Sequence, residues 1–226
     1  MEQRRQLLKA LAAAGLLGPA GISGLISEAL AKGQAPIRPG LNRVHGEVIV
    51  NHKLAKEGQL LQAGDTIVTG RDSEAVYVIG KDAFMQRELT TVNFGNDALQ
   101  NLMRVVTGRI LSVFGKGART IQTSTATIGI RGTGCYIEDE SQGANSRTYF
   151  CLCYGSVELT PTAAPQESER YNTWHHDKPM YIHNDMKMPK MMVPADVINH
   201  TDAELTLLES LVGRTPPFYG QGGKPY

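Results

Sequence analysis

Three cysteines and a pair of adjacent histidines are the residues of this sequence with the most distinctive chemistry. Thiolate sulfur and imidazole nitrogen are the ligands that zinc, copper and non-haem iron take from proteins. The odd number of cysteines favours a metal or redox role over a complete set of disulfides. We therefore expect a site for zinc, iron or copper with the candidate ligands Cys135, Cys151, Cys153, His175 and His176.

A β-hairpin has to position these cysteines. Residues 123–159 alternate apolar and polar side chains, break at residues 141–146 and then resume, which is typical of two antiparallel strands. Side chains two apart in a strand share a face, so Cys151 and Cys153 point the same way. Cys135 falls opposite that pair, and the register decides whether it meets one of them or faces away.

The histidines follow on a separate predicted strand. A polar, Pro-bearing loop at residues 160–169 leads into an extended segment that ends in His175-His176-Asp177. Adjacent residues on a strand point to opposite faces, so only one imidazole would face the cysteines unless a loop or bulge brings in both. Asp177 could orient a ligating imidazole through its other ring nitrogen.

Two other interpretations of the cysteines stay open. In an oxidising compartment Cys135 can form a cross-strand disulfide with one partner and leave a single thiol. All three can instead be small buried residues of the sheet. A bridge between Cys151 and Cys153 is disfavoured, because residues two apart along a strand lie about 6.5 Å from each other.

A methionine-rich loop offers a second set of soft ligands. Thioethers bind copper(I), but the irregular spacing here favours flexible side chains that fill gaps where a Pro-containing loop packs on the β domain. The residues concerned are Met186, Met188, Met191 and Met192, with Met180 and His183 nearby.

The remaining polar candidates have structural interpretations. Arg131 could clamp an anionic ligand, yet pairing with a carboxylate inside the fold is favoured. His200, just before a predicted helix, could reach a metal site, but a surface or capping-loop position is favoured. The sequence has no Gly-Xaa-Ser-Xaa-Gly, His-Glu-Xaa-Xaa-His or Walker-type phosphate loop, so we do not expect an enzyme.

Composition indicates the fold class. The 226 residues suffice for one domain with a sizeable core, and 23 basic against 22 acidic side chains give no attraction to nucleic acid. The 24 glycines and 11 prolines, with only short apolar runs, suit many short strands joined by tight turns. We predict an all-β fold, a single β-sandwich or roll of short antiparallel strands, with one C-terminal α-helix packed on it.

The first 31 residues have the pattern of an export signal. Arg4 and Arg5 open a run similar to the twin-arginine motif, a weakly apolar segment follows, and Ala29 and Ala31 supply the small residues of a cleavage site. No later segment is apolar enough to span a bilayer. We therefore expect a periplasmic protein without a stable membrane anchor.

The rest of the chain divides into five parts. A lead-in linker at residues 32–42 precedes a β domain at 43–160, and a loop with additional strands occupies 161–198. A helix is predicted over 199–213, capped by Thr201 or Asp202 and carrying an apolar stripe that should dock on the β domain. Residues 214–226, with two adjacent prolines, are expected to be a flexible tail.

Several motifs of the β domain resemble those of a known family. They are Gly46-Glu-Val-Ile-Val50, Gly64-Asp-Thr-Ile-Val-Thr-Gly70 and Ser73-Glu-Ala75 in the first half, then Ile130-Arg-Gly-Thr133 and Tyr154-Gly-Ser-Val157. Together they resemble the FecR domain, a periplasmic module of ferric-dicitrate-type sensors, over roughly residues 43–159.

The resemblance implies a regulatory function. FecR-domain proteins often stand between an outer-membrane transporter and a cytoplasmic sigma factor, through a cytoplasmic segment and one transmembrane helix, and neither element is recognisable here. It therefore implies a non-enzymatic exported protein that binds a periplasmic or envelope protein partner, in envelope sensing or iron-linked signalling. The alternative function is a metal-binding or thiol-redox protein built on the Cys/His cluster.

Overall fold

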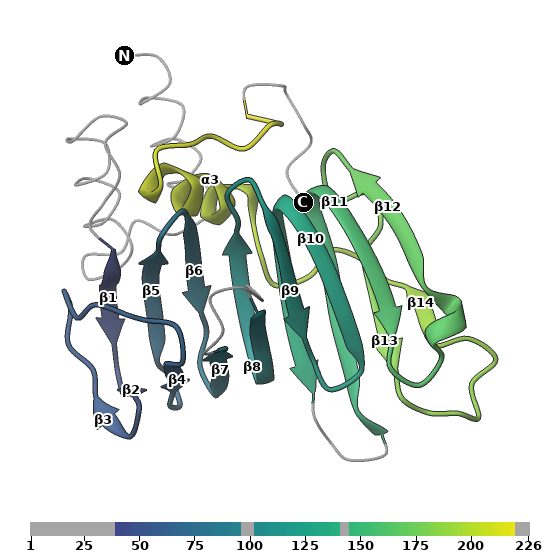
Figure 1. Ribbon diagram of the computed structural model, residues 1–226, viewed down its shortest axis with the longest axis horizontal. Helices are drawn as coiled ribbons and strands as arrows, with labels where there is room; N and C mark the ends of the chain where they lie inside the picture. Colours follow the sequence, from purple (N-terminus) through teal and green to yellow (C-terminus); the bar gives the residue numbers. More distant parts are fainter. Residues whose placement is uncertain (1–38, 96–101, 141–144, 220–226) are drawn as a thin grey trace.

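The computed structural model describes residues 39–95, 102–140 and 145–219 (Figure 1). The expected export signal and the tip of the cysteine hairpin lie outside the described residues. The strands are β1 (Gly40–His45), β2 (Val48–Val50), β3 (Lys53–Leu54), β4 (Thr66–Thr69), β5 (Glu74–Ile79), β6 (Asp82–Gln86), β7 (Thr90–Phe94), β8 (Leu102–Val113), β9 (Ala118–Gln122), β10 (Ala126–Glu140), β11 (Arg147–Pro161), β12 (Glu169–Thr173), β13 (Met180–His183) and β14 (Met192–Pro194). A short 3-10 helix, η2 (Pro165–Glu167), and the α-helix α3 (Asp202–Leu211) complete the described elements.

The strands form one 14-stranded sheet that folds over into two layers. The long strands β8, β10 and β11 belong to both. In the first layer the three long strands pair with each other through residues 108–113, 134–139 and 147–152. This layer is completed by β6, β5 and β1 beside β8, and by β13 and β14 beside β11. The other ends of the long strands pair with β7, β9 and β12 in the second layer, beside β4, β2 and β3. All pairs are antiparallel except β8 with β9.

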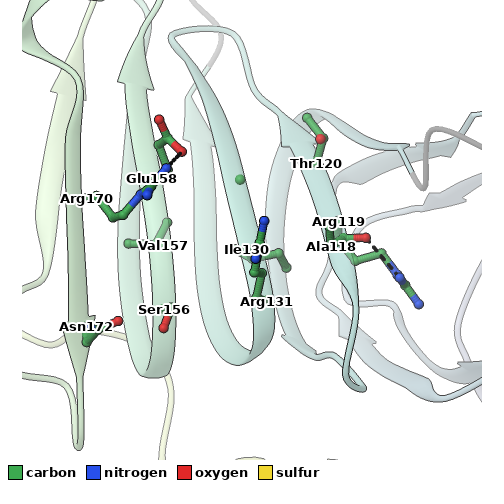
Figure 2. Close-up of a pocket in the computed structure, with 11 residues that line it drawn as sticks. Ala118, Arg119, Thr120, Ile130, Arg131, Ser156, Val157, Glu158, Arg170 and Asn172 are labelled. Carbon is green, nitrogen blue, oxygen red and sulfur yellow. Dashed lines mark hydrogen bonds and ion pairs between the residues drawn. The ribbon is translucent and has the colours of Figure 1, made fainter.

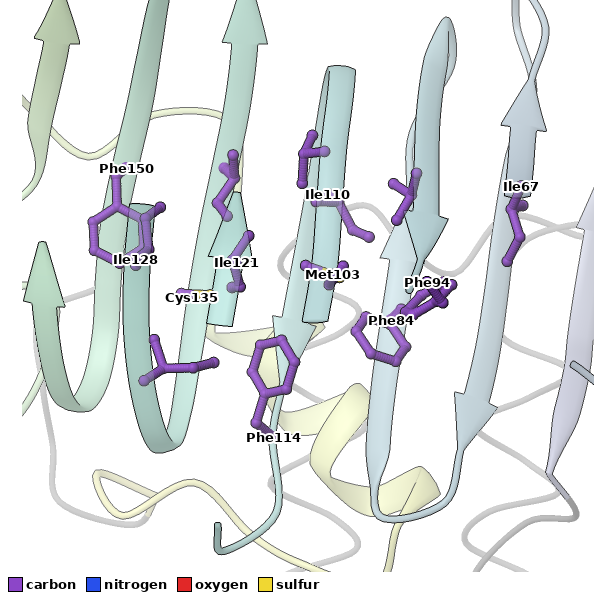
Figure 3. Close-up of a cluster of buried hydrophobic side chains, with 14 of the residues drawn as sticks. Ile67, Phe84, Phe94, Met103, Ile110, Phe114, Ile121, Ile128, Cys135 and Phe150 are labelled. Atoms are coloured by element: carbon purple, nitrogen blue, oxygen red, sulfur yellow. The ribbon is translucent and has the colours of Figure 1, made fainter. Parts of the chain in front are cut away.

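The first core lies between the two layers. Strand alternation turns one face of each layer inward, so that Phe84 of the first layer meets Phe94 of the second with ring centroids 5.3 Å apart. Figure 3 shows this cluster, with Ile110 and Phe150 from the first layer and Ile67 from the second. The predicted all-β class is confirmed, and its physical basis is this alternation.

A second core covers the opposite face of the first layer. The helix α3 crosses the strands near β6 and β8 (Figure 1) and buries Leu205, Leu208 and Leu211 against them. Its N-terminus is a capping box, in which Thr201 Oγ1 accepts the Glu204 backbone N–H and the Glu204 side chain accepts the Thr201 N–H. The predicted C-terminal helix is confirmed, with Thr201 as its cap.

Glycines mark the bends where the long strands pass from one layer to the other. Gly108 in β8 has φ +94°, and a Cβ there would lie 2.5 Å from Thr90 Cα. Gly155 in β11 has φ +100°, and a Cβ there would lie 2.7 Å from Thr133 Cγ2. Only glycine combines this backbone conformation with such close packing.

The expected flexible tail begins later than the sequence indicates. Arg214 forms an ion pair with Glu209 at 2.5 Å, and the ring of Phe218 is buried against Tyr154 and His175. These contacts fix residues up to 218 because the aromatic ring finds an apolar site at the end of the second core. In the part of the chain that the structure describes, no helix is long and apolar enough to cross a membrane.

Candidate metal centre

Two cysteine side chains of β11 project into the second core. Cys151 and Cys153 lie two residues apart on one strand and are both fully buried on the face that α3 covers. This agrees with the period of two that the sequence predicted. The sheet therefore supplies two sulfur atoms at a fixed spacing beneath the C-terminal part of the chain.

A tight turn after β12 brings one histidine over these sulfur atoms. The backbone N–H of His176 donates to the Cys153 carbonyl at 3.0 Å, and His176 itself has a left-handed backbone with φ +53°. The Asp177 carboxylate accepts the backbone N–H groups of Trp174 and His175 at 2.7 and 3.3 Å. Asp177 thus shapes the turn, whereas the sequence suggested that it orients an imidazole directly.

The second imidazole comes from His200, directly before α3. Its Nε2 lies 3.1 Å from His176 Nδ1, and its ring stacks on Tyr136 with centroids 4.6 Å apart. The side chain is buried, so the surface position is wrong, although His200 does lie in the loop directly before the helix cap, as the sequence favoured. The signal for this residue is its position: it precedes the capping box of a helix whose apolar stripe packs on the same face of the sheet as the two cysteines.

The four side chains form a compact ligand set. One ligand atom from each of Cys151, Cys153, His176 and His200 lies within 4.8 Å of the others, and all four residues are buried. Cys151 Sγ is 3.3 Å from His176 Nδ1. Tetrahedral zinc with two sulfur and two nitrogen ligands places its donor atoms about 3.3–3.8 Å apart, from bond lengths of about 2.3 and 2.0–2.1 Å. The Cys151–His176 and His176–His200 contacts, at 3.3 and 3.1 Å, are close to these spacings.

Each histidine has an outer partner that fixes where its proton lies. His176 Nε2 is 3.2 Å from Asp202 Oδ1, and His200 Nδ1 is 2.6 Å from the Ile198 carbonyl. Both partners are acceptors, so each neutral ring carries its N–H on the outside and a lone pair on the inside. The two inward nitrogens, 3.1 Å apart, can then share a cation, either a proton or a metal ion.

The electrostatic environment also suits a metal bound by thiolate. Hydrogen bonds from Cys153, His176 and His200 hold the pKa of Cys151 well below its usual value, against the effect of burial. Burial lowers the pKa of His176, but hydrogen bonds to Asp202 and Cys151 outweigh it and raise that pKa to about 9. Without a metal the cluster therefore favours a Cys151 thiolate beside a protonated His176, and a metal ion would take the place of the proton on His176 Nδ1.

Cys135 and His175 lie outside this ligand set. Cys135 pairs with Leu152 and points with it into the first core, where Figure 3 places it beside Ile121 and Ile128. Because Cys135 pairs with Leu152, the residue between the other two cysteines, its side chain lies on the face opposite Cys151 and Cys153, which also excludes the cross-strand disulfide. All three cysteines are free thiols.

His175 contributes to the outer shell of the site. Its Nε2 lies 2.9 Å from Asp202 Oδ2, so this carboxylate contacts both histidines of the turn at once. Both imidazoles of the turn converge on Asp202, and that of His176 also contacts Cys151. The structure therefore brings together three of the five candidate residues, adds His200, and moves His175 to the outside.

The methionine-rich loop does not converge on one point. Met180 and Met192 pack against the first core and Met191 is buried, whereas the side chain of Met186 is 73% exposed. This dispersion agrees with the packing interpretation.

A groove of about 380 Å³ crosses the outer face of the second layer over β9, β10, β11 and β12 (Figure 2). Arg131 stands in it between Ala118 and Ser156 of the neighbouring strands. Its guanidinium has no ion-pair or hydrogen-bond partner among the described residues, so the expected carboxylate partner is absent there. The strand face explains this, because the neighbouring positions carry small residues and the one carboxylate of the groove lining, Glu158, pairs with Arg170 at 2.6 Å.

No protein-family model matches the sequence, and no curated protein sequence matches it. Among solved structures, the chain is similar to two crystal structures of a protein from Parabacteroides distasonis ATCC 8503 described as a "putative anti-sigma factor". The sequence identities are 9% and 10%, and the TM-scores are 0.47 and 0.46. Each similarity covers 58% of this chain and 59% of that chain, less than two thirds of either.

Proposed function

We propose that this protein binds one transition-metal ion, zinc in the first instance, through Cys151, Cys153, His176 and His200. The observation that carries the proposal is the convergence of four buried ligand atoms with an outer acceptor on each histidine. Two sulfur and two nitrogen donors in a tetrahedral set are the ligands of structural zinc sites.

The ligand set indicates a structural metal and not a catalytic one. Catalytic zinc sites have three protein ligands and keep one position for water or substrate, whereas structural sites use four. Here four protein ligands are available inside a core, under Leu205 and Leu208 of α3. We propose that the metal fastens β11, the turn after β12 and the start of α3 to one another, and that the protein is not an enzyme.

Metal analysis of the protein purified without chelators tests the site. We expect about one equivalent of zinc in the wild type and almost none in the double variant Cys151→Ser/Cys153→Ser. Cys135→Ala is the matched control, because it removes a buried thiol of the same sheet from the opposite face and should retain the metal. Cobalt(II) substitution should give the intense visible bands of tetrahedral sulfur coordination. Stoichiometric zinc in the double variant, or a metal-free wild type, would refute the proposal.

For the whole chain we propose an exported, FecR-like binding protein of the periplasm, with a role in envelope sensing or iron-linked signalling. The sequence resemblance supports this, and its two central motifs are neighbours in the fold: Ile130 pairs with Val157, and Arg131 with Ser156. Export can be tested by cell fractionation. The wild type should reach the periplasm, and Arg4→Lys/Arg5→Lys should stay in the cytoplasm; equal export of both would contradict the twin-arginine route.

The groove over β9 to β12 supports partner binding as the second function. Arg131 is exposed and unpaired among the described residues, and Arg170 lies on the same strand face. Glu158, which pairs with Arg170, is the one acidic residue in the lining. Guanidinium groups bind carboxylates bidentately. We propose that an extended acidic segment of a protein partner binds here.

A labelled hexaglutamate peptide is a suitable probe for the groove. The wild type should bind it in low salt, with an affinity that falls as salt rises, because surface charges are screened. Arg131→Glu should weaken binding at least tenfold, while Arg71→Glu, an exposed arginine outside the lining, should not. If both variants lose peptide affinity equally, the effect comes from the net charge of the protein, and the assignment of the groove as the binding site is wrong.

A further inference from the structure

The C-terminal segment, residues 195–218, covers an otherwise apolar sheet face. Its leucines pack on side chains that point outward from the first layer. The sheet residues that it buries include Val76, Val78, Met85, Leu111, Val113 and Tyr136. Without the segment, this face would expose a contiguous apolar patch of the kind that marks protein-binding surfaces.

The proposed metal ligands are divided between that segment and the sheet. Cys151 and Cys153 belong to β11, and the backbone of His176 is hydrogen-bonded to β11. His200 is the one ligand that the segment contributes, and Asp202, the outer partner of His176, follows it at the first position of α3. Lifting the segment off the sheet therefore removes one ligand and one supporting carboxylate together.

We infer that the metal controls whether the C-terminal segment covers the outer face of the first layer. This inference rests on the proposed metal site and concerns its regulation. The closed form offers four ligands and the open form three, so the metal binds the closed form more tightly. By linkage, each tenfold rise of free zinc above the Kd of the closed form lowers the open population tenfold. This dependence ends when the zinc concentration approaches the higher Kd of the open form, which then also binds zinc.

Polar contacts between the C-terminal segment and the sheet also hold the segment in place, independently of the metal. Arg87, directly after β6, donates to Glu204 at 2.6 Å, and Tyr154 donates to the Glu209 carboxylate, which Arg214 also contacts. These contacts do not depend on the metal, so the helix returns to the same position after each opening. The closed occupant of the face is this segment, and the open form presents the face to an amphipathic helix of a partner.

Hydrogen exchange of the full-length protein at buffered free zinc concentrations tests the inference. The backbone amides of Leu205 to Leu211 should exchange about 100-fold more slowly at 100 times Kd than without zinc. The amides of β4, in the second layer, should exchange far more slowly than those of α3 under all conditions. Cys153→Ser should show fast, zinc-independent exchange in α3, and Cys135→Ala should behave as the wild type. His200→Ala provides the same test from the segment side if the serine variant does not fold.

The outcomes separate the two proposals. Stoichiometric zinc with zinc-independent exchange in α3 overturns the inference and leaves the metal site intact. Equal exchange rates in α3 and β4 also overturn it, because the segment would then open only when the whole domain unfolds. A protein that binds no zinc overturns the metal site and the inference together.

Discussion

Asp202 offers the sharpest test of how the metal site is held. Its carboxylate contacts Nε2 of both His175 and His176, at 2.9 and 3.2 Å, without being one of the four proposed ligands. Removing an outer carboxylate of this kind typically costs 10–100-fold in metal affinity. Asparagine retains one neutral acceptor, so we expect about a tenfold loss of zinc affinity for Asp202→Asn, or about 1.4 kcal/mol. Alanine, which retains none, should approach 100-fold.

The assay is a zinc competition titration against a chelator of known affinity. The fluorescence of Trp174, the one tryptophan of the sequence and the neighbour of His175, gives an independent signal. Asp185→Asn is the matched control, because Asp185 lies in a loop and bonds to the backbone of Lys187. The metal-free stability of Asp202→Asn should fall by about 1–2 kcal/mol, since the helix-dipole contribution and the charge that faces the two imidazoles are lost while one neutral acceptor remains.

Two results would refute the reasoning. If Asp202→Asn binds zinc within twofold of the wild type, the carboxylate does not support His176 and the assignment of ring protons fails. If Asp202→Asn and Asp202→Ala lose affinity only in proportion to a large loss of metal-free stability, the effect comes from helix α3 and not from the outer shell.

Three further predictions concern the scaffold. Gly108→Ala should destabilise the domain by more than about 3 kcal/mol in urea denaturation, because the backbone strain at φ +94° adds to a backbone clash with Thr90. An unchanged urea midpoint would contradict the positive φ and close packing that we assign to this glycine. Thr201→Ala should cost about 1 kcal/mol through loss of the helix cap, measured against Thr120→Ala on the surface. Burial raises the pKa of the Asp139 carboxyl in the folded protein, so the protonated carboxyl favours folding. The contribution of this group to the free energy of unfolding therefore falls as pH rises from its unfolded-state pKa to its higher folded-state pKa. Asp139→Asn should flatten that part of the curve of unfolding free energy against pH, and an identical curve would contradict it.

The sequence was most informative where structure follows local periodicity. The alternation of β10 and β11 predicted that Cys151 and Cys153 share a face, and Thr201, one of two candidate caps, predicted the start of α3. Both are decided by residues within a few positions of each other, through strand pleat and helix capping. Local chemistry therefore sufficed for the fold class and for half of the proposed ligand set.

The face of Cys135 depends on a register that the sequence left open to within one residue. Cys135 pairs with Leu152, which lies between Cys151 and Cys153, so it shares the face of Leu152 and not that of the two cysteines. Pairing is irregular between Arg131 and Cys135, but the two shifts cancel, and the strands keep the same register on both sides. A register different by one residue would have placed Cys135 opposite Cys151 or Cys153, and strand alternation alone does not decide between these registers.

The selection between the two histidines follows from a single backbone conformation. His176 adopts φ +53°, which ends the extended segment and turns its ring under the C-terminal segment, while His175 remains on the outer side. A left-handed residue costs free energy when it is not glycine, so it persists where surrounding contacts over-determine it. Here the His176 N–H bond to Cys153 and the Asp177 cap provide those contacts.

His200 shows why a metal site can be incomplete in the sequence and complete in the fold. It lies 47 positions after Cys153 (200 − 153), in a segment whose own pattern predicts only a helix start. Its ring enters the site because the leucines of α3 dock on the sheet face that carries the cysteines, and its orientation is set by Tyr136 and the Ile198 carbonyl. The dependence runs both ways: docking of the helix completes the ligand set, and a bound metal would hold the helix in place. A site built in this way is sensitive to any event that competes for either the metal or the apolar face.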